Sequence, residues 1–339
     1  MNYHLRIASL AVLAIRLAAS GWAQSPPPVI LEIDMENVVN YVDDLADPSR
    51  KATSPAISPL AAGFIWAFKT NLTQGDIVAV NGKPAKGFFV QQFGPRALAA
   101  TQLTPGQSIA DLGGGCQLQA GIMILRSDGT AVGTIMATGT TAMGPPPGAP
   151  SSASAFNFAV VGGTGAFLGV RGQAARGKAT GVRNASMAED PAYRRLNGGG
   201  TQRFIVHLTD AIRPEVIMTP GGPAIYHAED FTPVTPEQPA RAGELLVLQA
   251  ANLGPTRPGV DPGQPFPDWD PAKVPVAVTP LEAAVGGQAA EVRNVIGWPG
   301  EMNVYRVDVR LPDDAKPGTG KLSLTSAWIA GPEVPIPIR

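Results

Sequence analysis

Three polar residues, Asn157, Arg171 and His207, lie on predicted strands and are the candidates to line an enclosed site. An amide, a guanidinium and an imidazole can each hydrogen-bond a ligand, and a histidine can also transfer a proton near neutral pH. Successive side chains of a strand point to opposite faces, and His207 lies on the face opposite Phe204 and Val206. The candidates therefore face either a lumen or the solvent, and the sequence leaves both orientations open.

The chain lacks the residue patterns of common catalytic and metal sites. It contains no Gly-x-Ser-x-Gly nucleophile turn and no Walker phosphate loop. Beyond the N-terminal segment, its histidines are His207 and His227, and Cys116 is its one cysteine, far from both in the sequence. The loop 261–270 carries three aspartates that could bind calcium, but its prolines favour a rigid, exposed loop. We therefore predict no metal and no cofactor.

The segment 155–172 decides the fold of the first two-thirds of the chain, because two structures fit its β-branched run and Gly162-Gly163-Thr164-Gly165. One is the strand-to-helix turn of a dinucleotide-binding fold, where glycines let the backbone approach a pyrophosphate. That turn needs a helix directly after it, and each glycine inside a helix costs about 1 kcal/mol relative to alanine. The glycines that would fall in this helix are Gly165, Gly169, Gly172, Gly177 and Gly181.

The other structure is a β-hairpin, which the alternation of Phe156, Phe158 and Val160 favours. The structural turn is then 162–165, where the glycines supply positive φ angles. A second strand returns from Phe167. We expect the hairpin, and with it an antiparallel all-β fold.

This hairpin resembles the Gly-Gly-Thr-Gly hairpin of the allene oxide cyclase and dirigent barrels, where an aromatic residue and Ala/Val-Arg-Gly follow. Phe167, Val170, Arg171 and Gly172 match that pattern over a short stretch. The resemblance implies that 29–211 form a closed, antiparallel eight-stranded barrel. Such barrels close a ring in an epoxide, or orient radicals, by confining them in the lumen. Of the three candidate residues, Arg171 alone lies in the shared motif.

The remaining chain predicts a linker and a second β domain. Prolines are dense over 212–239, which favours a stiff linker. Short strands over 240–339 are typical of an immunoglobulin-like β-sandwich. Asn-Leu-Gly-Pro at 252–255, Gly-Trp-Pro-Gly at 297–300 and Ala-Trp-Ile-Ala-Gly at 327–331 resemble an Ig-like module of uncharacterised secreted soil-bacterial proteins.

The N-terminus predicts secretion, either extracellular or periplasmic. Residues 1–23 form a signal peptide pattern: a short cationic start, an apolar stretch over 7–15, and small residues before a cut after Ala23. An uncleaved anchor is the alternative, but so short a stretch cannot span a bilayer. With 26 Lys+Arg against 27 Asp+Glu, the chain has no basic field for nucleic acid, and we expect no membrane span.

Two functions remain open, and whether the protein is an enzyme stays uncertain from the sequence. The first is a non-enzymatic secreted protein that binds a small apolar ligand, or an extracellular protein or surface partner. The second is a cofactor-free cyclase, isomerase or dirigent-like activity in the barrel lumen. A cavity lined by convergent polar side chains favours the second function, and a lumen filled by Leu, Phe and Val counts against it.

Overall fold

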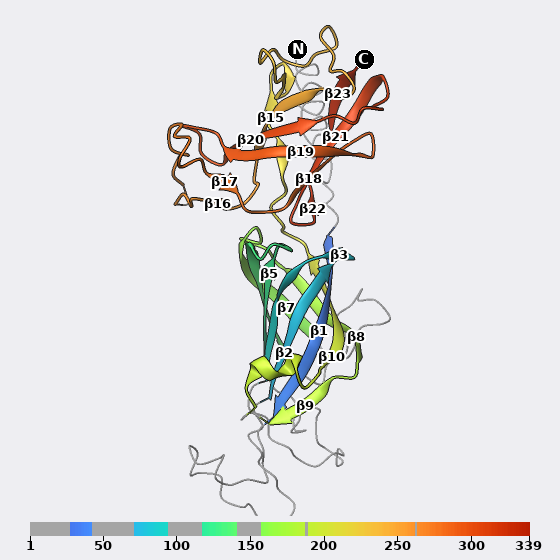
Figure 1. Cartoon of the computed structure of the whole chain (residues 1–339), viewed down its shortest axis with the longest axis vertical. Coiled ribbons are helices and arrows are strands. Elements are labelled where there is room, and N and C mark those ends of the chain that lie inside the picture. The colour runs from blue at the N-terminus through green and yellow to red at the C-terminus, as the bar shows by residue number, and fades with distance from the viewer. Residues whose placement is uncertain (1–27, 43–70, 94–116, 141–156, 187–188, 262) are drawn as a thin grey trace, which may run out of the picture.

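The computed structural model describes residues 28–42, 71–93, 117–140, 157–186, 189–261 and 263–339. The predicted signal peptide, a strand expected over 63–69 and Cys116 lie outside this part of the chain. The described part is built from β-strands and one short 3-10 helix, arranged as two domains stacked along the long axis (Figure 1). No helix within it is long and apolar enough to cross a membrane.

The first domain is a closed antiparallel barrel of eight strands, as the sequence predicts. Its ring order is β2-β4-β5-β6-β7-β8-β10-β1, and β1 pairs with β2 to close it. The ring strands are β1 (Val29–Val42), β2 (Asn71–Val80), β4 (Lys86–Phe93), β5 (Gln117–Leu125), β6 (Ala131–Thr140), β7 (Asn157–Gly165), β8 (Gly172–Thr180) and β10 (Gly200–Leu208). Outside this ring, the short strand β3 (Lys83–Pro84) pairs with β2, and β9 (Arg183–Ser186) pairs in parallel with β1. The 3-10 helix η3 (Pro191–Arg195) follows β9.

The barrel has two unlike ends. We call the end that meets the second domain the capped end and the opposite end the far end (Figure 1). Tight turns at Asn81–Gly82 and Ser127–Gly129 join strands at the capped end, where the Asn-Gly and Asp-Gly pairs of the sequence predict them. Apolar residues alternate along each strand, so the inward faces form one hydrophobic core.

The hairpin of β7 and β8 confirms that the chain turns back and does not enter a helix. The turn, however, lies later than expected. Gly162 to Gly165 continue β7 and pair with β6, and the chain reverses over 166–171. A Cβ at Gly163 would lie 2.4 Å from the carbonyl oxygen of Phe167, so the glycine is required because the turn folds back over its own strand. The dinucleotide-binding interpretation is therefore wrong.

The segment 212–239 is part of the second domain, where the sequence predicts a linker. Within it, β11 (Glu215–Val216) and β14 (Ile225–His227) both pair with β15 (Leu245–Ala251). Val216, Ile225 and Val234 are buried in that domain's core. The prolines shorten these strands without separating the segment from the sheet, because only the ladder donors at the prolines themselves are lost.

The second domain is a curled, sandwich-like sheet system of short strands. Besides β15, its longer strands are β18 (Leu281–Val285), β19 (Gln288–Gly297), β20 (Val304–Arg310), β21 (Gly318–Ser326) and β23 (Val334–Ile338). Its short strands are β12 (Met218–Thr219), β13 (Gly222–Pro223), β16 (Thr256–Arg257), β17 (Val276–Ala277) and β22 (Ile329–Ala330). β19 is a long strand that pairs with β18 along one part of its length and with β20 along another, so it connects the strands on the two sides of the domain.

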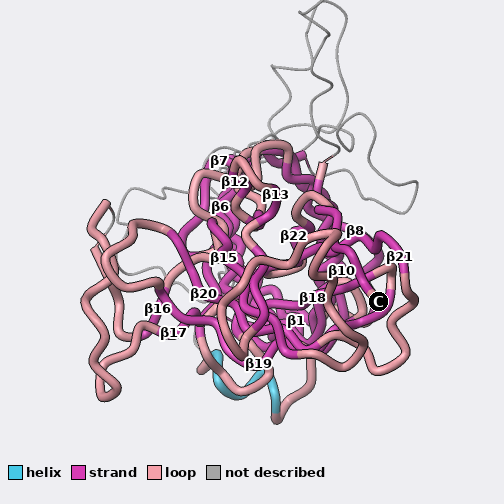
Figure 2. Tube along the Cα trace, turned by 90° about the horizontal axis from the view of Figure 1, so that it is seen from above, coloured by secondary structure: helices cyan, strands magenta, loops and turns pink. Residues whose placement is uncertain are grey.

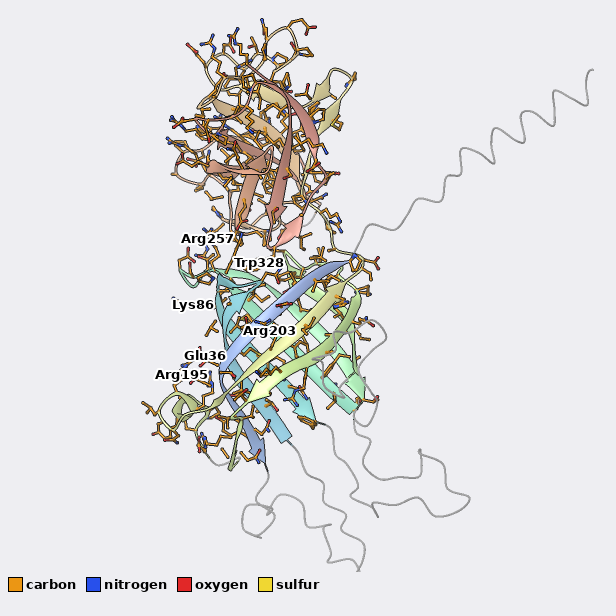
Figure 3. The ribbon with its side chains drawn as sticks, turned by 90° about the vertical axis from the view of Figure 1, so that its right-hand side faces the viewer. Glu36, Lys86, Arg195, Arg203, Arg257 and Trp328 are labelled. Atoms are coloured by element: carbon orange, nitrogen blue, oxygen red, sulfur yellow. The ribbon has the colours of Figure 1, made fainter. Side chains whose placement is uncertain are left out.

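The turn between β21 and β22 closes the capped end of the barrel. Ala327 and Ile329 are buried in the barrel's core cluster although they belong to the second domain, and Trp328 packs against that cluster. Trp328 lies where the two domains meet (Figure 3). An exposed ion pair between Lys83 and Glu282, 2.6 Å apart, also joins the domains. The second domain thus supplies apolar side chains that complete the barrel core.

Candidate functional site

The middle of the barrel lumen is filled by side chains. Phe204 packs against Phe89 and Phe158, each with ring centroids 5.3 Å apart. Branched apolar residues of neighbouring strands surround these rings, among them Ile33 and Ile122. All of these side chains belong to one buried hydrophobic cluster, and such clusters are close-packed in protein interiors. This part of the lumen is core, and it counts against an apolar ligand bound at the centre of the barrel.

Polar side chains face the lumen between this aromatic layer and the far end. Gln91 is the next inward residue after Phe89 on β4, and Thr73 of β2 is its direct cross-strand neighbour. Thr73 donates to Oδ1 of Asn40 across 2.6 Å. Gln91 is fully buried, yet neither its amide nitrogen nor its amide oxygen has a hydrogen-bond partner. A buried amide without partners is costly and needs an explanation.

Two further polar groups come from the opposite wall. Gln202 precedes Phe204 on the inward face of β10, and Arg176 of β8 pairs with Phe204. Arg176 donates from Nη2 to Oε1 of Gln202 across 3.1 Å, while Nε2 of Gln202 has no partner. Burial lowers the pKa of Arg176 to about 10, so it remains a cation at neutral pH. We call Asn40, Thr73, Gln91, Arg176 and Gln202 the polar belt.

The polar belt can bind and orient, but its groups are poorly suited to proton transfer. It contains amides, a hydroxyl and a guanidinium, all with protonation states that do not change near neutral pH. A general acid or base needs a pKa near the working pH. The belt therefore offers hydrogen-bond donors and acceptors and one positive charge.

His207, a sequence candidate for the lumen, lies on the outer face of the barrel. Its neighbours Val206 and Leu208 are buried in the core, and strand alternation turns His207 outward, where it is partly exposed. Arg203 shares this outer face and pairs with Asp34 across 2.7 Å (Figure 3). His207 thus has the solvent-facing orientation that the sequence left open.

Arg171, the second candidate, lies at the same end of the barrel as His207 but outside the lumen. Arg171 is exposed in the turn before β8, and its Nη1 donates to the carbonyl oxygen of Val170 across 2.9 Å. Buried Phe167 and Val170 of the same turn fill the capped end in its place. Asn157 begins β7 at the far end, and its side chain lies outside the described part of the structure. Arg171 and His207 thus share the capped end of the barrel but not its lumen, whereas Asn157 starts at the opposite end.

A charged cluster fixes η3 beside the far end, outside the lumen. Asp76 of β2 accepts hydrogen bonds from Arg194 and Arg195 of η3 and from Asn37. Burial alone would raise the pKa of Asp76, but these hydrogen bonds outweigh it and lower the pKa to about 2. Both carboxylate oxygens of Asp76 accept guanidinium hydrogen bonds, which indicates a structural ion-pair cluster, although Nε of Arg194 is buried without a partner.

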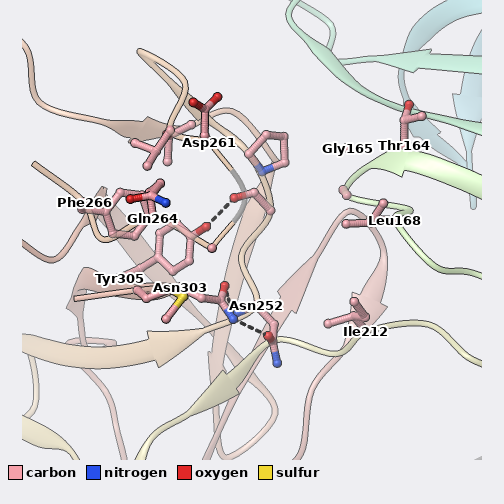
Figure 4. A pocket seen from close by; sticks show the side chains of 17 residues that line it. Thr164, Gly165, Leu168, Ile212, Asn252, Asp261, Gln264, Phe266, Asn303 and Tyr305 are labelled. Carbon is pink, nitrogen blue, oxygen red and sulfur yellow. Dashed lines mark hydrogen bonds between the residues drawn. The ribbon is translucent and has the colours of Figure 1, made fainter.

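A pocket of about 500 Å³ lies at the capped end, between the two domains (Figure 4). The β7–β8 turn lines one side, through Thr164 and Leu168, and loops of the second domain line the other. Among the described residues, no three His, Cys, Asp or Glu side chains gather as metal ligands would, in this pocket or elsewhere.

Comparison with known proteins gives no assignment. No family model, no curated protein and no solved structure matches the chain. Function therefore has to be argued from the geometry.

The sequence did carry a signal for the polar belt. Gln91 alternates with Phe89 and Phe93, and Gln202 alternates with Phe204, so both glutamines fall on strand faces that are otherwise apolar. The same alternation places His207 opposite Phe204. A polar residue that alternates with core residues on one strand face, as Gln91 and Gln202 do, was thus a better lumen candidate than a titratable residue on the opposite face, as His207 is.

Proposed function

We propose that this chain is a secreted, non-enzymatic binding protein whose barrel takes the polar group of a small ligand at the far end of the lumen. The observation that carries this is Gln91, which presents a donor and an acceptor, both buried and both without a partner. Gln202 and Arg176 add a second donor and a positive charge on the facing wall. Because the aromatic layer fills the centre, the bound group must be small and polar.

Several elements of this proposal rest on the sequence. The N-terminal pattern supports secretion, and the resemblance to allene oxide cyclase and dirigent barrels supports a lumen that works by confinement. The resemblance of the second domain to an Ig-like module supports contacts with an extracellular protein or a surface.

Native mass spectrometry of the chain purified from its own culture medium tests the proposal. We expect a co-purifying small molecule that Gln91→Leu loses, because the variant keeps the shape of the side chain but removes both polar atoms. Gln92→Leu is the matched control, since Gln92 is its exposed neighbour on β4. A bare wild-type chain, or a molecule that Gln91→Leu retains, would contradict a lumen ligand.

A cofactor-free cyclase, isomerase or dirigent-like activity is the second candidate, and the convergence of polar groups from β2, β4, β8 and β10 favours it. Confinement and a few hydrogen bonds can accelerate a reaction without a titrating residue. Incubating the recovered molecule, or its precursor, with the protein separates the two. A binding protein returns it unchanged, whereas the second candidate converts it and loses that conversion in Gln91→Leu.

A further inference from the structure

The pocket between the domains is lined by residues from distant parts of the chain (Figure 4). The barrel contributes the β7–β8 turn, and the second domain contributes the loop after β15, residues 260–261 and 263–266, and the turn before β20. Its volume of about 500 Å³ is in the range of small-molecule sites, which bury most of a ligand of drug size. The pocket lies at the opposite end of the barrel from the polar belt.

Exposed apolar side chains converge on this pocket from both domains. Leu168 of the barrel, and Ile212 and Met302 of the second domain, are 60%, 46% and 56% exposed, and all three line it. Large apolar groups this exposed are usually scattered singly over a protein surface, and a cluster of them marks an interaction site. Methionine also adapts to varied ligand shapes and contacts aromatic rings favourably.

The inner wall of the pocket is aromatic and rigid. Phe266 and Tyr305 meet edge to face with ring centroids 5.1 Å apart. The hydroxyl of Tyr305 donates to the carbonyl oxygen of Gly254, which fixes the loop after β15. A Cβ at Gly254 would lie 2.5 Å from Oγ1 of Thr279, so the glycine lets this loop pack closely. Both rings are almost fully buried, so the part of them that reaches the pocket is held in place and offers another ring an apolar, aromatic contact.

The polar groups around the pocket are neutral or acidic. Asn303 donates from Nδ2 to Oδ1 of Asn252 across 2.8 Å, which orients both amides at one side. Burial raises the pKa of Tyr305 to about 12, so its phenol stays neutral. Among the described residues that line the pocket, Asp261 is the one charged side chain, and it is exposed at the rim (Figure 4). This charge pattern disfavours an anion.

We propose that the interdomain pocket is a second binding site, which takes a flat, mainly apolar aromatic molecule that is neutral or cationic. The ligand contacts Leu168 of the barrel and Met302 of the second domain together, so it joins the domains as well as filling the space between them. This pocket is separate from the lumen site, so an experiment can contradict either proposal and leave the other standing.

A pair of fluorescent probes with similar rings and different charge tests the proposal on the full chain. N-phenyl-1-naphthylamine is neutral, and 1-anilinonaphthalene-8-sulfonate is its anionic counterpart. We expect saturable binding of the neutral probe, at least fivefold tighter than that of the sulfonate. Asp261→Asn should reduce the ratio of the two probe affinities at least twofold, because it removes the negative charge that repels the sulfonate. Equal affinity for the two probes would overturn the ligand class.

Two exposed substitutions test the location. Leu168→Gln and Met302→Gln should each weaken binding of N-phenyl-1-naphthylamine at least fivefold, one from each domain. Leu196→Gln is the matched control, since Leu196 is 81% exposed and lies outside the pocket. Because all three side chains are exposed, the variants should fold, and the circular dichroism spectrum checks this. Unsaturable binding, or an equal effect of all three substitutions, would overturn the site.

Gln91→Leu should leave the affinity for N-phenyl-1-naphthylamine unchanged, which separates this pocket from the lumen site.

Discussion

The two ends of the barrel lumen are closed by different chemistry. At the capped end, Ala327 and Ile329 of the second domain enter the barrel's apolar core. At the far end, Gln91 and Gln202 are buried with polar atoms that lack partners. Apolar closure stabilises, whereas incompletely paired polar groups destabilise unless something binds them. Apolar packing therefore stabilises the capped end, and the far end is where we propose that the lumen binds a polar group.

Phe204→Ala tests the layer that separates the two ends and should have the largest effect. Removing a buried ring that contacts Phe89 and Phe158 leaves a cavity, and we expect a loss of about 3–5 kcal/mol in the free energy of unfolding. Urea denaturation measures it, with Ile30→Ala on the exposed outer face of β1 as a control near zero. A loss under about 1 kcal/mol would mean that the lumen is not packed.

Ile329→Ala tests the capped end. We expect a loss of about 2–4 kcal/mol that reaches the barrel, since this side chain of the second domain is buried in the barrel core. Hydrogen exchange should become faster in β1 and β10. Ile336→Ala is the matched control, because Ile336 is buried in the core of the second domain. If Ile329→Ala leaves exchange in the barrel unchanged, the second domain does not stabilise the barrel.

Asp76→Asn tests the ion-pair cluster beside the far end. The folded pKa of about 2 lies below the ordinary value of 3.8, so the ionised carboxylate stabilises the fold above about pH 4. That contribution, up to about 2 kcal/mol, is lost as the pH falls through the folded pKa. The wild type should therefore lose stability between about pH 4 and pH 2, and Asp76→Asn should lose less. Identical pH profiles in denaturation would contradict this assignment.

Gln91→Leu tests the far end of the barrel, and we expect this substitution to stabilise the protein. Replacing a buried amide without partners by an apolar side chain of similar size should raise the free energy of unfolding by about 1 kcal/mol. Gln92→Leu, on the exposed face, should change it by less than about 0.5 kcal/mol. A loss of stability in Gln91→Leu would show that the amide already has its partners, and that the far end is a structural network.

Glu282→Gln should have the smallest effect, although Glu282 bridges the domains. The Lys83–Glu282 pair is about half exposed on both sides, and such pairs contribute about 0–1 kcal/mol. We expect a change under about 0.5 kcal/mol in thermal or urea unfolding, still smaller at high salt. A larger effect would mean that charge, and not apolar packing, holds the domains together.

The sequence determined the strands and much of the pairing. Alternating apolar residues, with Asn81-Gly82 and Asp128-Gly129 at the turns, are local signals, so β4 and the turn between β5 and β6 lie where the sequence predicts them. The recurring glycines after Val161 excluded a helix for the same local reason. The turn of that hairpin was placed too early, since its position depends on pairing with β6 and not on the glycines alone.

Tertiary structure alone decided which residues share a site. Gln91, Arg176 and Gln202 are far apart in the chain, and closure of the ring between β1 and β2 brings their strands around one lumen. The interdomain pocket needs the β7–β8 turn and the loop after β15 together, which no local pattern specifies. Local alternation fixes the face that a side chain points to, but the neighbours it meets there depend on long-range pairing and on the docking of the two domains.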